Sequence, residues 1–175
     1  MQLAARDDFE LFGLEPRYRL DRAELDARWK RLAAQVHPDR HLGQGAAAQA
    51  QAMQWALRVN EAYRRLRDPL QRGAYLCEQR GAPIQAESNT HMCMAFLGEQ
   101  MAWREALDEA DEESAIDQLQ AQVKRRQHGL FDTVARELDD ADGSPQRAAQ
   151  AVRSLMFVAR FLQDIERRRD ALFPL

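Results

Sequence analysis

The sequence predicts an all-α protein, with an N-terminal helical hairpin followed by a C-terminal three-helix bundle. Of its 175 residues 45% are hydrophobic and 30% charged, with only 8 Gly and 6 Pro. Together with frequent Ala, Leu, Arg, Glu and Gln, this composition favours helix over strand and is sufficient for a buried core. No window shows the alternation of apolar and polar residues that is typical of a half-buried strand.

The first helix of the predicted hairpin begins after Asp21. This residue can cap the helix, and Glu24, three residues later, makes a capping-box-like pair with it. Pro38 marks the end, because the residue before a proline is disfavoured in the α region. Helical spacing predicts an apolar face formed by Leu25, Trp29, Leu32 and Val36.

The second helix of the hairpin is predicted over residues 46–67, after a loop that contains two glycines. Pro69 then interrupts the chain before a short amphipathic helix. The buried stripe of the second helix is predicted to be Met53, Ala56, Asn60 and Tyr63. An N-terminal segment is expected to close the hairpin with Phe9, Leu11, Phe12 and Leu14.

Gly81, Ala82 and Pro83 mark a domain boundary. We therefore expect a first domain over residues 1–76, a linker over 77–83 and a second domain over 84–175.

The second domain is predicted to contain helices over residues 89–110, 112–139 and 144–172, which short connections join into a bundle. The last one starts with Ser144 as the cap and Pro145 at the first helical position. Its apolar stripe is predicted to be Ala148, Val152, Leu155, Ala159 and Leu162. The stripe of the preceding helix is predicted to be Ile116, Leu119, Val123, Leu130, Val134 and Leu138.

Charge and cysteine content exclude several functions. The net charge of −3, with both signs spread along the chain, argues against nucleic-acid binding. No signal peptide and no apolar run long enough to span a bilayer is visible, so we expect a cytoplasmic protein without a membrane partner. Cys77 and Cys93 form no CxxC pair and are expected to be free thiols, so that no metal and no cofactor is predicted.

The most informative motif is His37-Pro38-Asp39, in the loop between the first two long helices. Taken alone it is weak, since His37 could simply hydrogen-bond a helix end. His37 and His41 are four residues apart, which on a continuous helix would suggest the metal pair of a hydrolase. Pro38 between them argues against such a helix.

The surrounding residues give this motif its context. Upstream lies the segment FELFGL, residues 9–14, and downstream lies VNEAYRRLRDP, residues 59–69, followed by Arg72 and Tyr75. In this order and spacing, residues 7–76 resemble the J-domain family. The resemblance implies docking onto the nucleotide-binding domain of a DnaK-type ATPase and acceleration of ATP hydrolysis. The protein is then a regulator of a partner ATPase and no enzyme itself.

The residue types of the motif suit this role. Asp39 can accept charge-assisted hydrogen bonds from an arginine of the chaperone, and Pro38 reduces the ordering entropy lost on docking. His37 offers both a donor and an acceptor. Positive charges nearby suit an acidic partner surface. The predicted chaperone-binding residues are His37, Pro38, Asp39, Arg40, Arg28, Lys30 and Arg31.

The C-terminal half resembles the HscB group, through the segment FLGEQMAWREALDE at residues 96–109. The segment Leu11-Phe12-Gly13-Leu14 also fits, while the Gly/Phe-rich linker and zinc-binding cysteine cluster of other J-proteins are missing. The resemblance implies delivery of an IscU-like iron–sulfur scaffold to a DnaK/HscA-type chaperone. Two alternatives stay open: a generic J-protein that delivers unfolded clients to the housekeeping DnaK, and a structural adaptor with a degenerate J-domain.

Helical geometry separates two apolar stripes in this region. Phe96, Trp103 and Leu107 form one, and Met94, Leu97 and Met101 form the other. One stripe suffices to pack a surface helix, so the second either binds a partner or packs within the protein. Phe157 is predicted to lie almost opposite the buried stripe of the last helix.

The resemblance implies that Leu97, Met101, Glu105, Glu109 and Phe157 occupy scaffold-binding positions. Geometry adds Met94 to the apolar stripe and Asp108 to its acidic border. Gly98 and Ala102 depart from the family pattern, which often has a larger apolar residue and an acid at these places.

Overall fold

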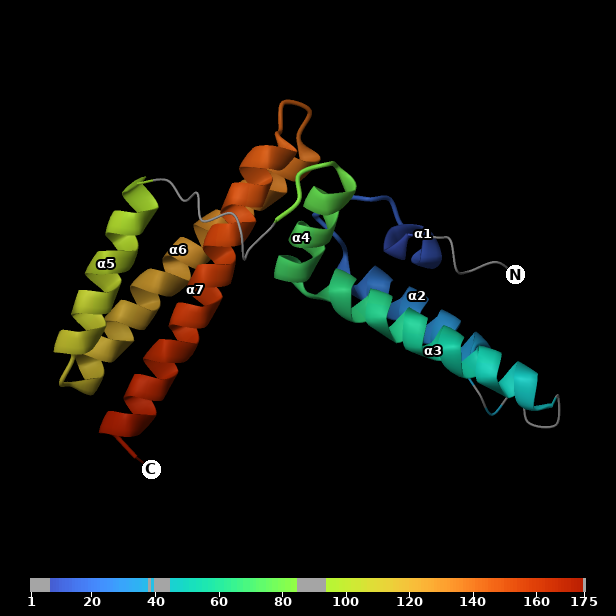
Figure 1. Ribbon diagram of the computed structural model, residues 1–175, viewed down its shortest axis with the longest axis horizontal. Helices are drawn as coiled ribbons and strands as arrows, with labels where there is room; N and C mark the ends of the chain where they lie inside the picture. Colours follow the sequence, from blue (N-terminus) through green and yellow to red (C-terminus); the bar gives the residue numbers. More distant parts are fainter. Residues whose placement is uncertain (1–6, 38, 40–44, 85–93, 175) are drawn as a thin grey trace. The chain divides into compact units, whose positions relative to one another are not determined.

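The computed structural model describes residues 7–37, 39, 45–84 and 94–174. These residues form seven helices and no strand, which confirms the all-α prediction. The chain divides into two compact units, Met1–Leu76 and Cys77–Leu175 (Figure 1). Within the described residues, no helix combines the length and the apolar character that a membrane span requires.

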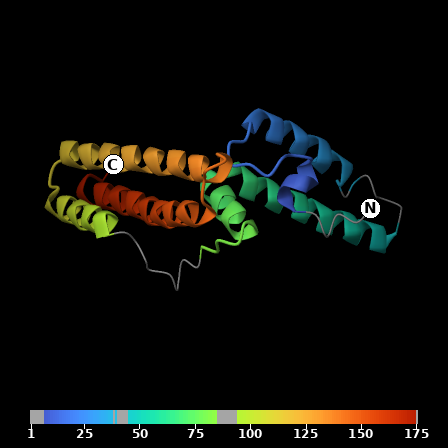
Figure 2. The ribbon, with the colours of Figure 1, turned by 90° about the horizontal axis from the view of Figure 1, so that it is seen from above.

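The first unit is built on the hairpin of α2 (Arg22–Gln35) and α3 (Ala46–Arg67), which lie side by side (Figures 1 and 2). Asp21 caps α2 as predicted, because its carboxylate accepts the N–H groups of Ala23 at 2.8 Å and Glu24 at 3.3 Å. The side chain of Glu24 binds Arg28.

The buried centre of α3 differs from the predicted stripe. Ala52, Val59, Ala62 and Leu66 are buried, whereas Met53 is 58% exposed. The predicted Asn60 and Tyr63 are half-buried beside α2: Trp29 stacks on Tyr63 at 4.5 Å and donates its indole N–H to Asn60 at 3.0 Å. The buried stripe is displaced by one position along the chain, about 100° around the helix, from the predicted one.

Two short helices complete this unit. The helix α1 (Asp8–Phe12) buries Phe9, Leu11 and Phe12 as predicted, and ends at Gly13 with a positive φ of 65°. The helix α4 (Pro69–Gln79) is capped by Asp68, whose carboxylate accepts the N–H groups of residues 70 and 71. Pro69, at the first position of α4, has no backbone N–H and therefore needs no acceptor there.

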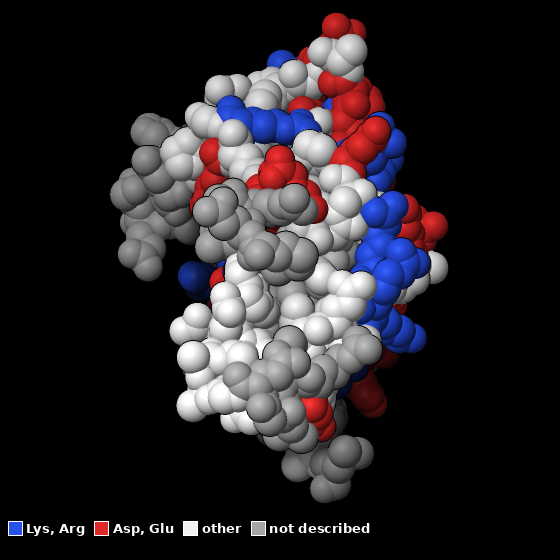
Figure 3. All heavy atoms as spheres, turned by 90° about the vertical axis from the view of Figure 1, so that its right-hand side faces the viewer, with Lys and Arg blue, Asp and Glu red and all other residues white. Residues whose placement is uncertain are grey.

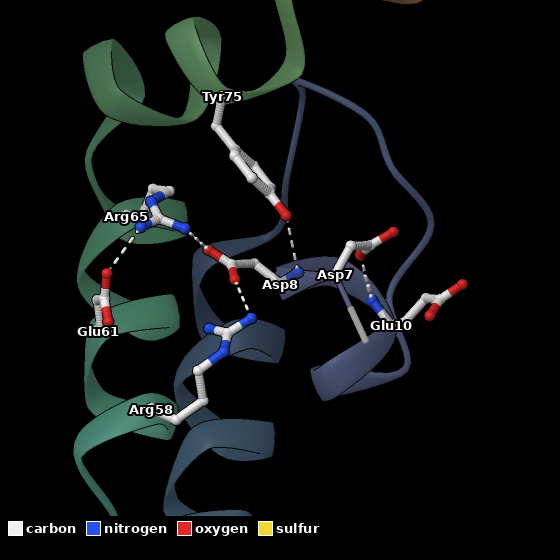
Figure 4. Close-up of polar contacts among 7 residues, drawn as sticks. All are labelled: Asp7, Asp8, Glu10, Arg58, Glu61, Arg65 and Tyr75. Carbon is white, nitrogen blue, oxygen red and sulfur yellow. Dashed lines mark hydrogen bonds and ion pairs between the residues drawn. The ribbon is translucent and has the colours of Figure 1, made fainter. Parts of the chain in front are cut away.

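A buried aspartate joins three of these helices, through its carboxylate and its backbone N–H (Figure 4). Asp8 of α1 is fully buried and lies 2.6 Å from Arg58 and 2.8 Å from Arg65, both on α3. Its backbone N–H donates to the Tyr75 hydroxyl of α4 at 3.0 Å, and Arg65 lies over the Tyr75 ring. Because a buried charge requires partners, this cluster fixes α1 against α3 and α4.

The second unit is a bundle of α5 (Met94–Glu109), α6 (Glu113–Asp139) and α7 (Pro145–Leu172) (Figure 2). The Ser144 hydroxyl caps α7 at the N–H of Arg147, with Pro145 at the first position, as predicted. All six residues predicted for the α6 stripe are buried. On α7 the predicted Ala148, Val152 and Leu155 are buried, whereas Ala159 and Leu162 are only half-buried. In the C-terminal half of this helix the buried positions are instead Val158, Phe161 and Ile165.

The turn between α6 and α7 depends on close backbone packing. A Cβ at Gly143 would lie 2.4 Å from the carbonyl oxygen of Glu137, so only glycine fits. The Glu137 carboxylate lies 2.7 Å from Arg147 and accepts the Ser144 N–H at 3.1 Å. Burial opposes ionisation of Glu137, but these contacts and the nearby Arg136 outweigh it and lower the pKa of the carboxyl.

The expected linker packs as part of the second unit. Cys77 belongs to the last turn of α4, and Cys77 and Ala82 are both buried. Arg80 donates to the Leu138 carbonyl and Arg153 to the Ile84 carbonyl, which holds this segment on α6 and α7. Burial raises the pKa of the Cys77 thiol to about 11. Cys93 lies outside the described residues.

Candidate functional site

The first candidate site follows the end of α2 and is called the loop site: His37 and Asp39, with Lys30, Arg31 and Arg28 of α2. Val36 caps the helix, and the two loop side chains that follow are 58% and 76% exposed. The Asp39 carboxylate is therefore accessible to a partner. Pro38 and Arg40, which the sequence assigned to the same site, lie outside the described residues.

Positive charge accompanies the loop site along α2. Lys30 and Arg31 are exposed, and Arg31 lines a shallow hollow of about 160 Å³ together with Leu11 and Phe12 of α1. Figure 3 shows Lys and Arg side chains in a band along one edge of the surface, beside an area with few charged groups. Such a band attracts an acidic surface.

Arg28 differs from its neighbours, because its donors are already used within the protein. Its guanidinium donates to the carbonyl oxygens of Phe12 at 2.8 Å and Gly13 at 2.6 Å, and binds the Glu24 carboxylate at 2.6 Å. Arg28 thus holds the end of α1 on α2, and its side chain is 34% exposed. The sequence alone did not predict this structural contribution.

The second candidate site is the α5 patch, defined as Met94, Leu97 and Met101. The predicted stripe of Phe96, Trp103 and Leu107 is buried against the bundle. The three patch side chains lie outside it and are 82%, 36% and 73% exposed, respectively. Isolated exposed apolar residues are ordinary, but three within two turns of one helix form a surface suited to a partner.

The sequence predicted that Phe157 lies almost opposite the buried face of α7, and this prediction is wrong. It is half-buried against α5, where its ring meets Phe96 edge-on at 5.9 Å and stacks on Phe161 at 6.0 Å. The Arg104 guanidinium covers it at 5.9 Å. The helical wheel of α7 alone could not show this, because α5 covers a second face of that helix.

The predicted acidic border of the patch is exposed at Glu105, Asp108 and Glu109. Gly98 leaves an open place beside the patch, since a Cβ there would meet nothing within 4 Å. Glu99 forms an ion pair within the bundle, 2.7 Å from Arg126 of α6. The sequence missed both Arg126 and Arg104, whose contacts depend on how the three helices pack.

Sequence reasoning also missed an exposed apolar pair on α3, Met53 and Leu57, which are 58% and 64% exposed. A signal was present, since no Asp, Glu, Lys or Arg occurs between Arg40 and Arg58. No group of three or more His, Cys, Asp or Glu side chains suited to a metal ion gathers within the described residues.

Comparisons with known proteins cover both units. Residues 92–166 match the family model described as the HSCB C-terminal oligomerisation domain. The co-chaperone protein HscB homolog of Bordetella pertussis is 47% identical over 164 residues, which span 93% of this chain and 96% of the relative.

Two solved structures share the fold over nearly the whole chain. Chaperone HscB from Vibrio cholerae has a TM-score of 0.79 and 30% identity, with 96% of this chain and 100% of that chain covered. The human co-chaperone protein HscB has a TM-score of 0.87 and 28% identity, with 98% and 84% covered. Sequence and fold agree along both units, and the chain therefore belongs to the HscB family of co-chaperones.

Proposed function

We propose that this protein is a co-chaperone of iron–sulfur cluster assembly. It binds an IscU-like scaffold protein, delivers it to a DnaK/HscA-type chaperone and stimulates the ATPase of that chaperone. The observation that carries the proposal is the 47% identity to a co-chaperone HscB homolog across 93% of the chain, which includes both candidate sites. The cytoplasm is the predicted compartment.

The loop site is the proposed contact with the chaperone. His37, Pro38 and Asp39 form its centre, and the exposed Asp39 carboxylate supports a charge-assisted hydrogen bond to an arginine of the partner. Lys30 and Arg31 contribute exposed positive charge that steers docking, and Arg40 is proposed to add to it. Arg28 contributes charge, but mainly keeps α1 in place on α2.

The α5 patch is the proposed contact with the scaffold. Met94, Leu97 and Met101 supply exposed apolar surface, which the binding of a protein partner would bury. The rim assigned to the same interface consists of Glu105, Asp108 and Glu109, with the half-buried ring of Phe157. Carboxylates at the edge of an apolar patch favour a partner with basic side chains around an apolar centre.

Steady-state ATPase measurements test the proposal. The purified protein is added to the HscA-type chaperone and, in parallel, to the housekeeping DnaK of the same cells, each with and without the IscU-like scaffold. We expect stimulation of the HscA-type chaperone that rises further with scaffold, together with scaffold binding by calorimetry. Equal stimulation of DnaK, without scaffold binding, would instead support a generic J-protein.

A further inference from the structure

Two of the three side chains of the α5 patch are methionines that solvent can reach. Met94 is 82% and Met101 73% exposed. They lie two turns apart on α5, about 10.5 Å along the axis, with Leu97 between them. Of the other methionines that the structure describes, Met53 of α3 is 58% exposed and Met156 of α7 is half-buried. Among the described residues, the patch therefore holds the two most accessible thioethers.

An exposed thioether reacts with a peroxide without help from any other group. A lone pair of the sulfur attacks one oxygen of hydrogen peroxide, so that an S–O bond forms and the O–O bond breaks. The sulfur is oxidised by two electrons to a sulfoxide, and the second oxygen takes up the remaining proton and leaves as water. Because the oxidant must reach the sulfur, Met94 and Met101 should be oxidised before Met53 and Met156.

Oxidation changes the polarity of the patch and leaves its charge as it was. A sulfoxide is polar and accepts hydrogen bonds through its oxygen, whereas the thioether is an apolar contact group. Binding of a protein partner would bury this oxygen, and burial of a polar group without a hydrogen bond is unfavourable. Neither methionine belongs to the buried stripe of α5, so the contacts of the bundle core are preserved.

We propose that Met94 and Met101 are an oxidation site of this protein: hydroperoxides convert them to methionine sulfoxides, which weakens the binding of the scaffold to the α5 patch. This inference rests on the proposed function of the patch. Stimulation of the chaperone ATPase without scaffold is assigned to the first unit and is retained. The oxidised protein thus loses its client and keeps its contact with the chaperone, and methionine sulfoxide reductases reverse the change.

Peptide mass spectrometry follows the added oxygen while the full-length protein is treated with hydrogen peroxide. The peroxide is then removed, and dithiothreitol restores the cysteine thiols without reducing sulfoxides. We expect the dissociation constant for the untreated scaffold, measured by calorimetry, to rise at least about tenfold once both patch methionines are oxidised. The melting temperature should stay within about 2 °C of the untreated protein, and methionine sulfoxide reductases should restore the affinity.

Variants show whether these two sulfurs are responsible. The double variant Met94→Leu/Met101→Leu removes both sulfurs and keeps apolar side chains of similar volume. Each protein is compared with itself before and after peroxide, so that the starting affinity of a variant does not affect the result. The dissociation constant of the double variant should change by less than about twofold on treatment. Met53→Leu, the matched control on α3, should lose affinity as the wild type does.

The outcomes are distinct. Oxidation of Met53 or Met156 as fast as that of the patch methionines would overturn the assignment of the site. Unchanged affinity of the oxidised wild type, or an equal loss of affinity in the double leucine variant, would overturn the effect on scaffold binding. Absence of scaffold binding before any treatment would instead overturn the proposed function, and the order of oxidation would then still decide where the protein is oxidised.

Discussion

The guanidinium of Arg28 closes the C-terminus of α1 through Gly13: Nη1 lies 2.6 Å from the Gly13 carbonyl oxygen. Gly13 makes this approach possible, because a Cβ at that position would lie 3.0 Å from Nη1 and its φ of 65° disfavours other residues. Helix ends leave carbonyl groups without partners, and Arg28 satisfies two of them. A residue assigned to chaperone binding thus also stabilises the hairpin that presents the loop site.

We therefore expect Arg28→Ala to lower the free energy of unfolding by about 1.5–3 kcal/mol, the contribution of hydrogen bonds from a charged donor. Arg31→Ala is the matched control on the exposed side of the same helix and should change it by less than about 0.5 kcal/mol. Arg28→Lys keeps the charge without the planar fork of donors. It should therefore lose stability but still contribute positive charge to docking. Urea unfolding of the three variants measures this, and equal stability of Arg28→Ala and Arg31→Ala would contradict the structural role.

Asp8→Asn should be more damaging than its small change in shape suggests. The variant removes the charge that pairs with Arg58 and Arg65 inside the first unit. Because these two arginines are partly exposed, we expect a loss of about 2–4 kcal/mol, near the lower end for a broken buried pair. Glu61→Gln is the control: Glu61 also binds Arg65, but is 64% exposed, and its loss should cost less than about 0.5 kcal/mol. Unfolding free energies that agree between the two variants would refute the anchoring role of Asp8.

Local signals predicted much of this fold, whereas contacts between distant helices escaped prediction. Residues 46–67 were predicted as a helix and form α3 with the same ends, because the glycines of the preceding loop and Pro69 are local signals. The caps Asp21 and Ser144 likewise act on the next few residues.

The Asp8 cluster and the place of Phe157 could not be predicted in this way. Asp8 meets Arg65 across 57 positions of the chain, and only the packed hairpin brings them together. Phe157 is covered by α5, a helix that the periodicity of α7 does not describe. The α5 patch could be predicted as a second stripe, but not its exposure.

Acid should weaken the turn between α6 and α7 through Glu137. Its pKa is lowered in the folded protein, so its contribution to stability is complete above the ordinary glutamate pKa of about 4.3 and is lost as the pH falls through the lower folded value. Glu137→Gln cannot titrate. We expect amide exchange at the ends of α6 and α7 to be faster in Glu137→Gln than in the wild type at pH 7, with the difference shrinking as the pH falls below the ordinary glutamate pKa of about 4.3. A difference that does not change with pH would contradict this origin.

Asp39→Asn should separate docking from folding. The side chain is 76% exposed, so the unfolding free energy should change by less than about 0.5 kcal/mol. The amide keeps the shape but cannot form a charge-assisted pair with an arginine, so ATPase stimulation should disappear. Binding of the scaffold, assigned to the other unit, should be unchanged in calorimetry. Full stimulation by the folded variant would remove the loop site from the docking surface.

The α5 patch is tested by a variant that replaces Met94, Leu97 and Met101 with alanine. Alanine preserves the helix, and Met94 and Met101 are mostly exposed, while Leu97 is 36% exposed. We expect the scaffold affinity to fall by at least about 2 kcal/mol, since a few central apolar residues dominate the energy of an interface. The melting temperature should stay within about 2 °C of the wild type, as for other surface substitutions.

Trp103→Ala is the control from the buried stripe of the same helix. Trp103 is 3% exposed and stacks on Phe161 at 5.8 Å, so its removal should destabilise the second unit by about 3–5 kcal/mol. The two variants should therefore differ: the patch variant loses scaffold affinity but keeps its stability, whereas Trp103→Ala loses stability. ATPase stimulation without scaffold should persist in the patch variant, because the first unit is unchanged. If the patch variant melts early and binds weakly in proportion, the three residues stabilise the bundle and the scaffold binds elsewhere.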